Sequence, residues 1–223
     1  PFGVYQPSEI RRPKANYLPR GVRFVQSAID VIQPDRKQVR LTTNGISLRY
    51  DVLIIATGTD IRPEEVEGLQ GDGWRRDIFD FYTIEGATAL ADKLKDWEGG
   101  RMVIHLAEMP IKCPIAPIEF VCLADWYMTE KGVRDKTEIV YATPLEGAFT
   151  KPRASAMLGD ILDKKNIKVE GLFSAGSVDG ANGLLRSWDE REISYDLLVT
   201  IPTHMGSETI ERSGMGDELS FIP

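Results

Sequence analysis

The stretch RMVIHLAEMPIKCPIAPIEFVCLADWY, residues 101–127, decides the fold. It opens with a short apolar run, Met102 to Ile104, which is typical of a buried strand, and passes through Pro110 into a turn. After Pro114 and Pro117, apolar residues recur three and four apart, which predicts a helix. In doubly wound α/β domains, ligands bind in the crevice beyond the carboxyl end of such a strand.

The loop between this strand and helix holds no glycine, whereas a dinucleotide site needs glycines so that the backbone can approach a pyrophosphate. It holds Cys113 instead, between Lys112 and Pro114. A thiol at a helix N-terminus beside a lysine has its thiolate favoured, and the thiolate is the reactive form. The alternative is that Cys113 is a small apolar filler, as we expect for Cys122 in the middle of the helix.

Alternating strands and helices surround this stretch and predict a doubly wound, mostly parallel Rossmann-like sheet flanked by helices. Thr83 is the expected N-cap of the first helix, and Gly132 is expected to end the helix that follows Cys113. The remaining elements are expected at residues 137–143, 151–165, 167–172, 173–178, 184–188 and 195–201.

The first part of the chain predicts a β-meander. Residues 1–20 have little periodicity, strands are expected at 23–27, 28–32, 38–42 and 47–50, and Asn44-Gly45 is a strong hairpin turn signal. The unalternating apolar run at 51–56, DVLIIA, predicts a strand that is buried on both faces. The tail 203–223 has no pattern of its own.

Two stretches of the chain are similar, RYDVLIIATG at 49–58 and SYDLLVTIPTHMG at 194–206. Each has a Tyr-Asp pair, an apolar strand and a small-residue exit, so we expect the chain to leave one domain at about 58 and to return to it at about 202. The expected divisions are 1–75, 76–202 and 203–223.

Composition excludes several classes of protein. A net charge of -7 with scattered basic residues argues against a nucleic-acid partner, and the longest apolar runs are far shorter than a membrane span. Two cysteines are too few for a disulfide scaffold, and His105 and His204 are too few for a metal cluster, so we expect both histidines to be structural. The four tryptophans fall in different segments and are expected to serve packing. The sequence does not determine the oligomeric state and is compatible with a homo-oligomer.

The segment YDVLIIATG resembles the ATG motif of the pyridine nucleotide-disulfide oxidoreductase superfamily of FAD proteins, and the resemblance covers essentially the whole chain. Within it, KCPIAPIEF and RDKTEIVYATP resemble the sulfide:quinone oxidoreductase and flavocytochrome c sulfide dehydrogenase branch.

This resemblance implies an enzyme that oxidises sulfide through Cys113 and passes electrons by way of FAD to a quinone or a haem protein. It implies an acid/base role for Glu119, although a carboxylate in a first helical turn is also favoured by the helix dipole. It implies that Ala28, Thr57 and Gly58 contact FAD, that Pro202 lies near the flavin or the acceptor, and that the protein is cytoplasmic or peripherally membrane-bound.

The sequence also departs from the superfamily. The first GxGxxG and the later Gly-Asp motif are absent, and Tyr82 stands where some members carry a further cysteine. We therefore expect an internal fragment that neither retains FAD nor turns over by itself. Two alternatives remain: an NADH:quinone oxidoreductase of the type II kind, which the glycine-free loop disfavours, and a non-catalytic module that keeps the fold.

Overall fold

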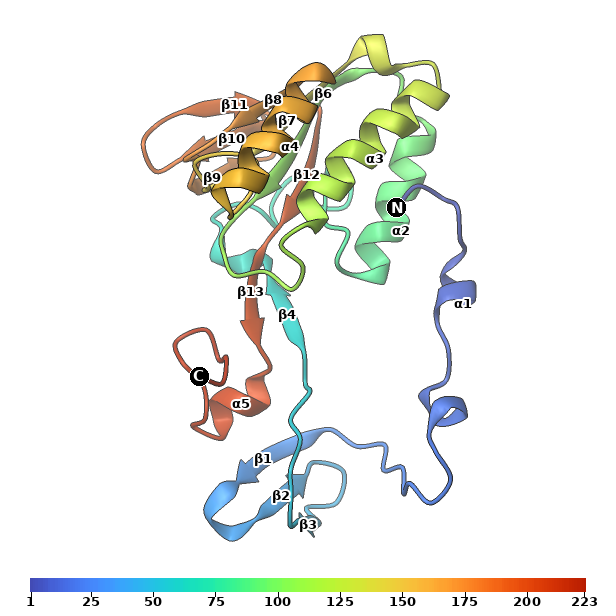
Figure 1. The fold of residues 1–223 in the computed structure, drawn as a ribbon, viewed down its shortest axis with the longest axis vertical. Coiled ribbons are helices and arrows are strands. Elements are labelled where there is room, and N and C mark those ends of the chain that lie inside the picture. Colours follow the sequence, from blue (N-terminus) through green and yellow to red (C-terminus); the bar gives the residue numbers. More distant parts are fainter. The chain divides into compact units, whose positions relative to one another are not determined.

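The computed structural model describes all residues, 1–223, and the chain forms two compact units (Figure 1). Unit 1 comprises residues 1–7 and 61–203, and unit 2 comprises residues 8–60 and 204–223. The chain therefore leaves unit 2 after Asp60 and returns to it at His204, and the two similar stretches of sequence lie at these passages. A two-stranded sheet forms where the chain passes from one unit to the other. Its strands are β4 (Thr59–Arg62) and β13 (Thr203–Gly206).

Unit 1 is built on a five-stranded parallel sheet of order β5-β12-β6-β7-β8. Its strands are β5 (Ile78–Phe79), β12 (Leu197–Ile201), β6 (Gly100–Leu106), β7 (Thr137–Ala142) and β8 (Ile167–Glu170). In the central register, Val103 lies beside Leu198 on one side and Val140 on the other. The sheet confirms the predicted α/β class.

Helices cover one face of this sheet: α2 (Ile84–Lys95), α3 (Ala116–Glu130) and α4 (Pro152–Lys164). Met102, Ile104 and Leu106 of β6 point into the core shared with these helices. Val103 points to the other face, which packs against the antiparallel sheet β9 (Ala175–Asp179), β10 (Leu184–Ser187) and β11 (Glu192–Ser194). Burial on both faces explains why the middle of each of β6, β7 and β12 is apolar without alternation, as in Met102 to Ile104 of β6.

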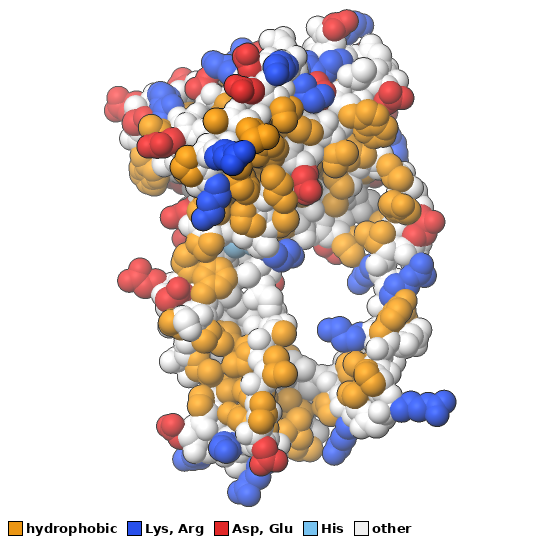
Figure 2. Space-filling view, in the orientation of Figure 1, with side chains coloured by type: hydrophobic (Ala, Val, Ile, Leu, Met, Phe, Trp, Pro, Cys, Tyr) orange, Lys and Arg blue, Asp and Glu red, His pale blue; other side chains and the backbone are white.

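Local signals set the helix ends. Thr83 caps α2 as predicted, and its hydroxyl accepts a 2.9 Å hydrogen bond from the amide of Gly86. Gly132, just beyond α3, has a φ of 74°, a conformation that glycine adopts without strain. Figure 2 shows hydrophobic side chains over α3 and α4, where Leu123, Trp126, Met157 and Ile161 are exposed.

Unit 2 has a small core. Strands β1 (Ile29–Gln33), β2 (Gln38–Leu41) and β3 (Ser47–Arg49) form an antiparallel sheet, and α5 (Glu208–Arg212) packs against it. The amide of Ile32 donates to the Ser213 hydroxyl at 2.9 Å, so the returning chain holds β1 by its backbone. The buried apolar residues of this unit are Ile32, Val39, Leu41 and Ile210. The remaining elements of the whole chain are helix α1 (Pro7–Ile10) and four 3-10 turns: Lys14–Tyr17 and Pro34–Arg36 in unit 2, and Pro63–Glu65 and Arg134–Lys136 in unit 1.

Several expectations for this unit were wrong. Residues 23–27 and 51–56 are not strands, and Val52 and Ile54 are 82% and 86% exposed instead of buried. An apolar run becomes a buried strand only where neighbouring strands satisfy its backbone, and residues 51–56 pair with none. The tail was expected to be patternless, but Ser207 caps α5 by accepting a hydrogen bond from the amide of Thr209.

Candidate functional site

The loop that carries Cys113 lies at the carboxyl end of β6. The amide of Ala107 donates to the carbonyl of Ile201 at 3.0 Å, which fixes the start of the loop beside β12. At its other end the amide of Ala116, the first residue of α3, donates to the carbonyl of Cys113 at 3.0 Å. Cys113 is half-buried, unpaired by any disulfide, and lies just before the first turn of α3.

Tyr82 is the side chain that sequence reasoning missed as a neighbour of Cys113. Its hydroxyl donates to the Cys113 carbonyl over a long 3.5 Å, and the Lys112 ammonium lies 5.6 Å from the centre of its ring. Burial, followed by the negative charges of Cys113 and Glu119, raises the pKa of Tyr82 to about 12. Tyr82 is thus a neutral hydrogen-bond donor at ordinary pH, and its hydroxyl faces the carbonyl of Cys113.

A row of aromatic rings holds Tyr82 in place. Phe81 stacks on Tyr82 with ring centres 5.1 Å apart and on Phe120 of α3 with ring centres 4.8 Å apart. Phe2 extends the row, since its ring centre is 5.3 Å from Phe120 and 5.4 Å from Tyr127. The two ring contacts of Phe2 secure the amino end of the chain to α3.

The other predicted residues of unit 1 take different places. Glu119 is exposed in the first turn of α3, and Cys122 packs against the core, where burial raises the pKa of its thiol. Pro202 is buried between β12 and β13. His105 is fully buried, its Nδ1 lies 3.1 Å from the Thr200 hydroxyl, its Nε2 has no hydrogen-bond partner, and burial lowers its pKa to about 3.

The three residues predicted to contact FAD lie in unit 2, where Ala28, Thr57 and Gly58 are exposed. The carbonyl of Ala28 accepts from the amide of Thr42 at 3.0 Å. Gly58 has a φ of 74°, and a side chain there would meet no other atom within 4 Å. The structure therefore brings Cys113 beside Tyr82, with Glu119 in the first turn of the following helix, and leaves these three residues on open surface.

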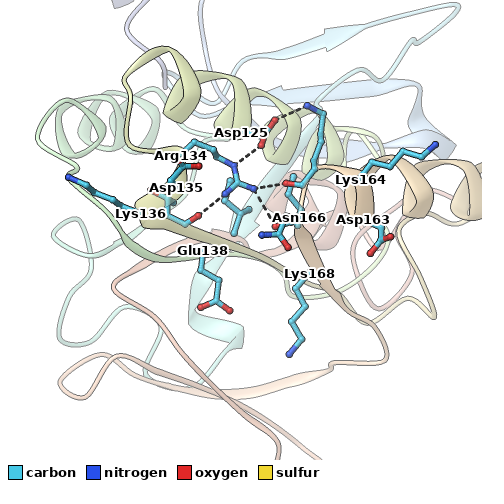
Figure 3. Close-up of a pocket in the computed structure, with 13 residues that line it drawn as sticks. Asp125, Arg134, Asp135, Lys136, Glu138, Asp163, Lys164, Asn166 and Lys168 are labelled. Atoms are coloured by element: carbon cyan, nitrogen blue, oxygen red, sulfur yellow. Dashed lines mark hydrogen bonds and ion pairs between the residues drawn. The ribbon is translucent and has the colours of Figure 1, made fainter.

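Two hollows lie beside the strands that follow Cys113 in the chain. One, of about 710 Å³, is lined by residues of the loop after β7 and the first turns of α4, at the same sheet edge as the Cys113 loop. The other, of about 900 Å³, lies at the amino ends of β7 and β8 and is rich in charged side chains (Figure 3).

The second hollow is organised by a structural ion pair. Arg134 donates to Asp125 of α3 at 2.7 Å and to the carbonyls of Thr137 and Lys165, and Lys165 also donates to Asp125 at 2.7 Å (Figure 3). Burial alone would raise the pKa of Asp125, but the hydrogen bonds from Lys165 and Arg134 outweigh it and hold that pKa below its usual value. The hydrogen bonds of Arg134 and Lys165 therefore connect α3, β7 and the end of α4. Cys113 lies at the opposite edge of the sheet, beyond the carboxyl ends of the strands.

No family model matches the chain. It is 20% identical over 219 residues to the mitochondrial sulfide:quinone oxidoreductase of Dictyostelium discoideum, which covers 96% of this chain and 48% of that protein. It is 23% identical over 217 residues to the mitochondrial sulfide:quinone oxidoreductase of Mus musculus, covering 95% of this chain and 48% of that protein.

Among solved structures, the sulfide:quinone oxidoreductase of Aquifex aeolicus superposes with a TM-score of 0.73 at 18% identity, covering 87% of this chain and 46% of that one. The chain spans about half the length of the curated relatives it matches. These matches confirm the resemblance that the motifs around Cys113 indicated. No helix is both long enough and apolar enough to cross a membrane.

Proposed function

We propose that this chain, which is homologous to sulfide:quinone oxidoreductases over about half of their length, contributes the sulfur-accepting cysteine of an FAD-dependent enzyme that oxidises sulfide. The observation that supports this most directly is the environment of Cys113: a half-buried residue with a free thiol at the carboxyl end of β6, in a loop without glycine, whose carbonyl accepts from the hydroxyl of Tyr82. Ligands of doubly wound domains gather at this edge of the sheet.

The chemistry at Cys113 is sulfur exchange. Hydrosulfide attacks a disulfide or persulfide that includes Cys113, one sulfur–sulfur bond forms, and another breaks to release a thiolate. Glu119, in the first turn of α3, takes up the proton of the attacking hydrosulfide. Quinone is the proposed acceptor of the two electrons that sulfide loses, with a haem protein as the alternative, and delivery to a lipid-soluble quinone implies peripheral contact with a membrane.

The residues of this chain do not form a FAD site by themselves. Ala28, Thr57 and Gly58 are exposed, and no glycine-rich turn at a helix N-terminus is present to hold a pyrophosphate. We therefore assign no step through a flavin to these residues, and we propose that FAD is held only together with further polypeptide.

The domain arrangement is part of the same proposal. We assign unit 1, with residues 61–203, to a second, NADH-domain-like domain, and unit 2, with residues 8–60 and 204–223, to a FAD-type domain; the boundary falls before residue 75 because Val66 and Leu69 are buried in the core of unit 1. The exposure of Val52 and Ile54 supports the second assignment, because an apolar backbone segment of this kind is stable only between neighbouring strands.

Sulfur uptake by this chain can be measured without a cofactor. The purified chain, its Cys113→Ser variant and its Cys122→Ser variant are incubated anaerobically with inorganic tetrasulfide, and the intact masses are compared. We expect one added sulfur atom on the wild-type chain and on the Cys122→Ser variant, and none on the Cys113→Ser variant. Equal labelling of the Cys113→Ser variant would show that Cys113 is only a packing residue.

The electron donor is identified in the flavin-containing protein that carries these residues. Sulfide or NADH is added anaerobically, and flavin absorbance is followed with and without Cys113→Ser. We expect bleaching by sulfide that the substitution abolishes. Bleaching by NADH that is indifferent to the substitution would support the type II NADH:quinone oxidoreductase alternative instead.

A further inference from the structure

The turn between β10 and β11 carries an exposed tryptophan, Trp188, that is not part of the hydrophobic core. Trp188 is 78% exposed, although its ring lies against Gly176 of β9. A β-carbon at Gly176 would be 3.1 Å from that ring. Gly176 is the extra residue of a bulge, since Arg186 pairs with Ser177 and Ser187 pairs with Ala175. Packing on Gly176 therefore accounts for one ring face and leaves the other open to solvent.

Hydrogen bonds hold this turn in place. The amide of Trp188 donates to the carbonyl of Ser174 at 3.0 Å, and the Ser187 hydroxyl accepts from the amide of Arg191 at 3.1 Å. The Arg191 guanidinium donates to Asp189 at 2.9 Å and to the carbonyl of Gly171 at 3.2 Å. The ring is therefore presented on a preorganised turn, which lowers the entropy that binding would cost.

The surface beside the ring is acidic. A hollow of about 330 Å³ is lined by Trp188, Glu67, Glu190 and Glu192 together with Arg186. Arg186, the cation among these residues, is paired with Glu192 at 2.7 Å. Glu67 and Glu190 have no ion pair in the structure. An open indole face next to two unneutralised carboxylates attracts a cation and repels phosphates.

We propose that Trp188, Glu67 and Glu190 form a docking surface for an arginine side chain on a basic segment of a partner protein. A guanidinium stacks on the indole face while its edge donates to the carboxylates, a combination that a rigid planar cation satisfies better than an ammonium does. Exposed tryptophans on preorganised turns are also the residue type that most often anchors protein interfaces.

The test is a titration of a fluorescein-labelled Gly-Arg-Gly-Arg-Gly peptide with the chain, followed by fluorescence anisotropy, alongside a peptide with glutamine in place of arginine. We expect the arginine peptide to bind the more tightly. Trp188→Ala should weaken its binding about two- to fivefold, the loss of one exposed cation–π contact. Glu67→Gln combined with Glu190→Gln should weaken it and flatten its salt dependence, while Trp188→Phe should retain part of the affinity.

Matched controls separate this surface from general attraction to an acidic protein. Trp126→Ala removes another exposed tryptophan, on α3, and Glu138→Gln removes a carboxylate outside the hollow; neither should change the affinity. Undiminished binding by Trp188→Ala would overturn the proposal, and so would equal binding of the glutamine peptide, which would indicate strand addition along β9. Absence of binding when the chain is raised to roughly millimolar concentration would overturn it as well.

Discussion

Asp125→Asn should destabilise unit 1 by about 2–3 kcal/mol. Removing one partner of a fully buried ion pair costs roughly 3–5 kcal/mol, and two features reduce that figure here. Arg134 keeps its carbonyl acceptors, and Lys165 is 39% exposed, so water stabilises its charge when Asp125 is lost. The side chains of Asp125 and Arg134 are only 11% and 17% exposed, so most of the effect should remain.

The assay is urea unfolding followed by tryptophan fluorescence. All four tryptophans lie in residues 61–203, so this signal reports unit 1 and not the small core of unit 2. With a urea dependence of roughly 2–3 kcal/mol per molar, the midpoint should fall by about 1 M. The control is Glu138→Gln, which breaks an exposed pair with Arg101 and should cost roughly 0–1 kcal/mol.

The stabilising contribution of Asp125 should also depend on pH. The pKa of Asp125 is lowered in the fold, so its contribution is present above the unfolded value of about 3.9 and is lost as pH falls through the folded value. The gap between wild type and Asp125→Asn should therefore be full at neutral pH and shrink below about pH 4. A midpoint shift no larger than that of Glu138→Gln, or a gap that does not change with pH, would refute the reasoning.

Two further predictions concern packing and ionisation in unit 1. Gly86→Ala should destabilise the chain by about 1–3 kcal/mol in the same urea assay, because the new β-carbon would lie 2.3 Å from both Arg75 and the buried carboxylate of Asp80. Gly159→Ala in α4, which meets nothing within 4 Å, should instead stabilise it by about 0.5–1 kcal/mol, and a loss at both sites would contradict the contact argument. In an alkaline titration of tyrosinate absorbance, Tyr82→Phe should remove one of the phenols that ionise near pH 12; a difference spectrum that shows the lost phenol to have ionised well below pH 12 would place Tyr82 in water.

Sequence reasoning succeeded where a local signal and the parallel sheet agreed. Thr83 caps α2, Gly132 follows α3, and the apolar runs at 102–104, 137–142 and 197–201 are buried strands. In each of these segments the local sequence favours one type of secondary structure, and neighbouring strands or helices of unit 1 pack against the element that forms. The position of Cys113 at a strand-to-helix loop followed from the same pattern.

The sequence by itself determined the order of elements in unit 1, because helix caps, turn residues and apolar periodicity act within a few residues of chain. Only the tertiary structure decided what residues far apart in sequence do to one another. Tyr82 reaches the Cys113 carbonyl across 31 positions, and Asp125 meets Lys165 across 40. It also decided that residues 51–56, as apolar as β12, stay unpaired and leave Val52 and Ile54 exposed. Burial on both faces depends on strands that must lie beside a segment, and no local pattern records their presence.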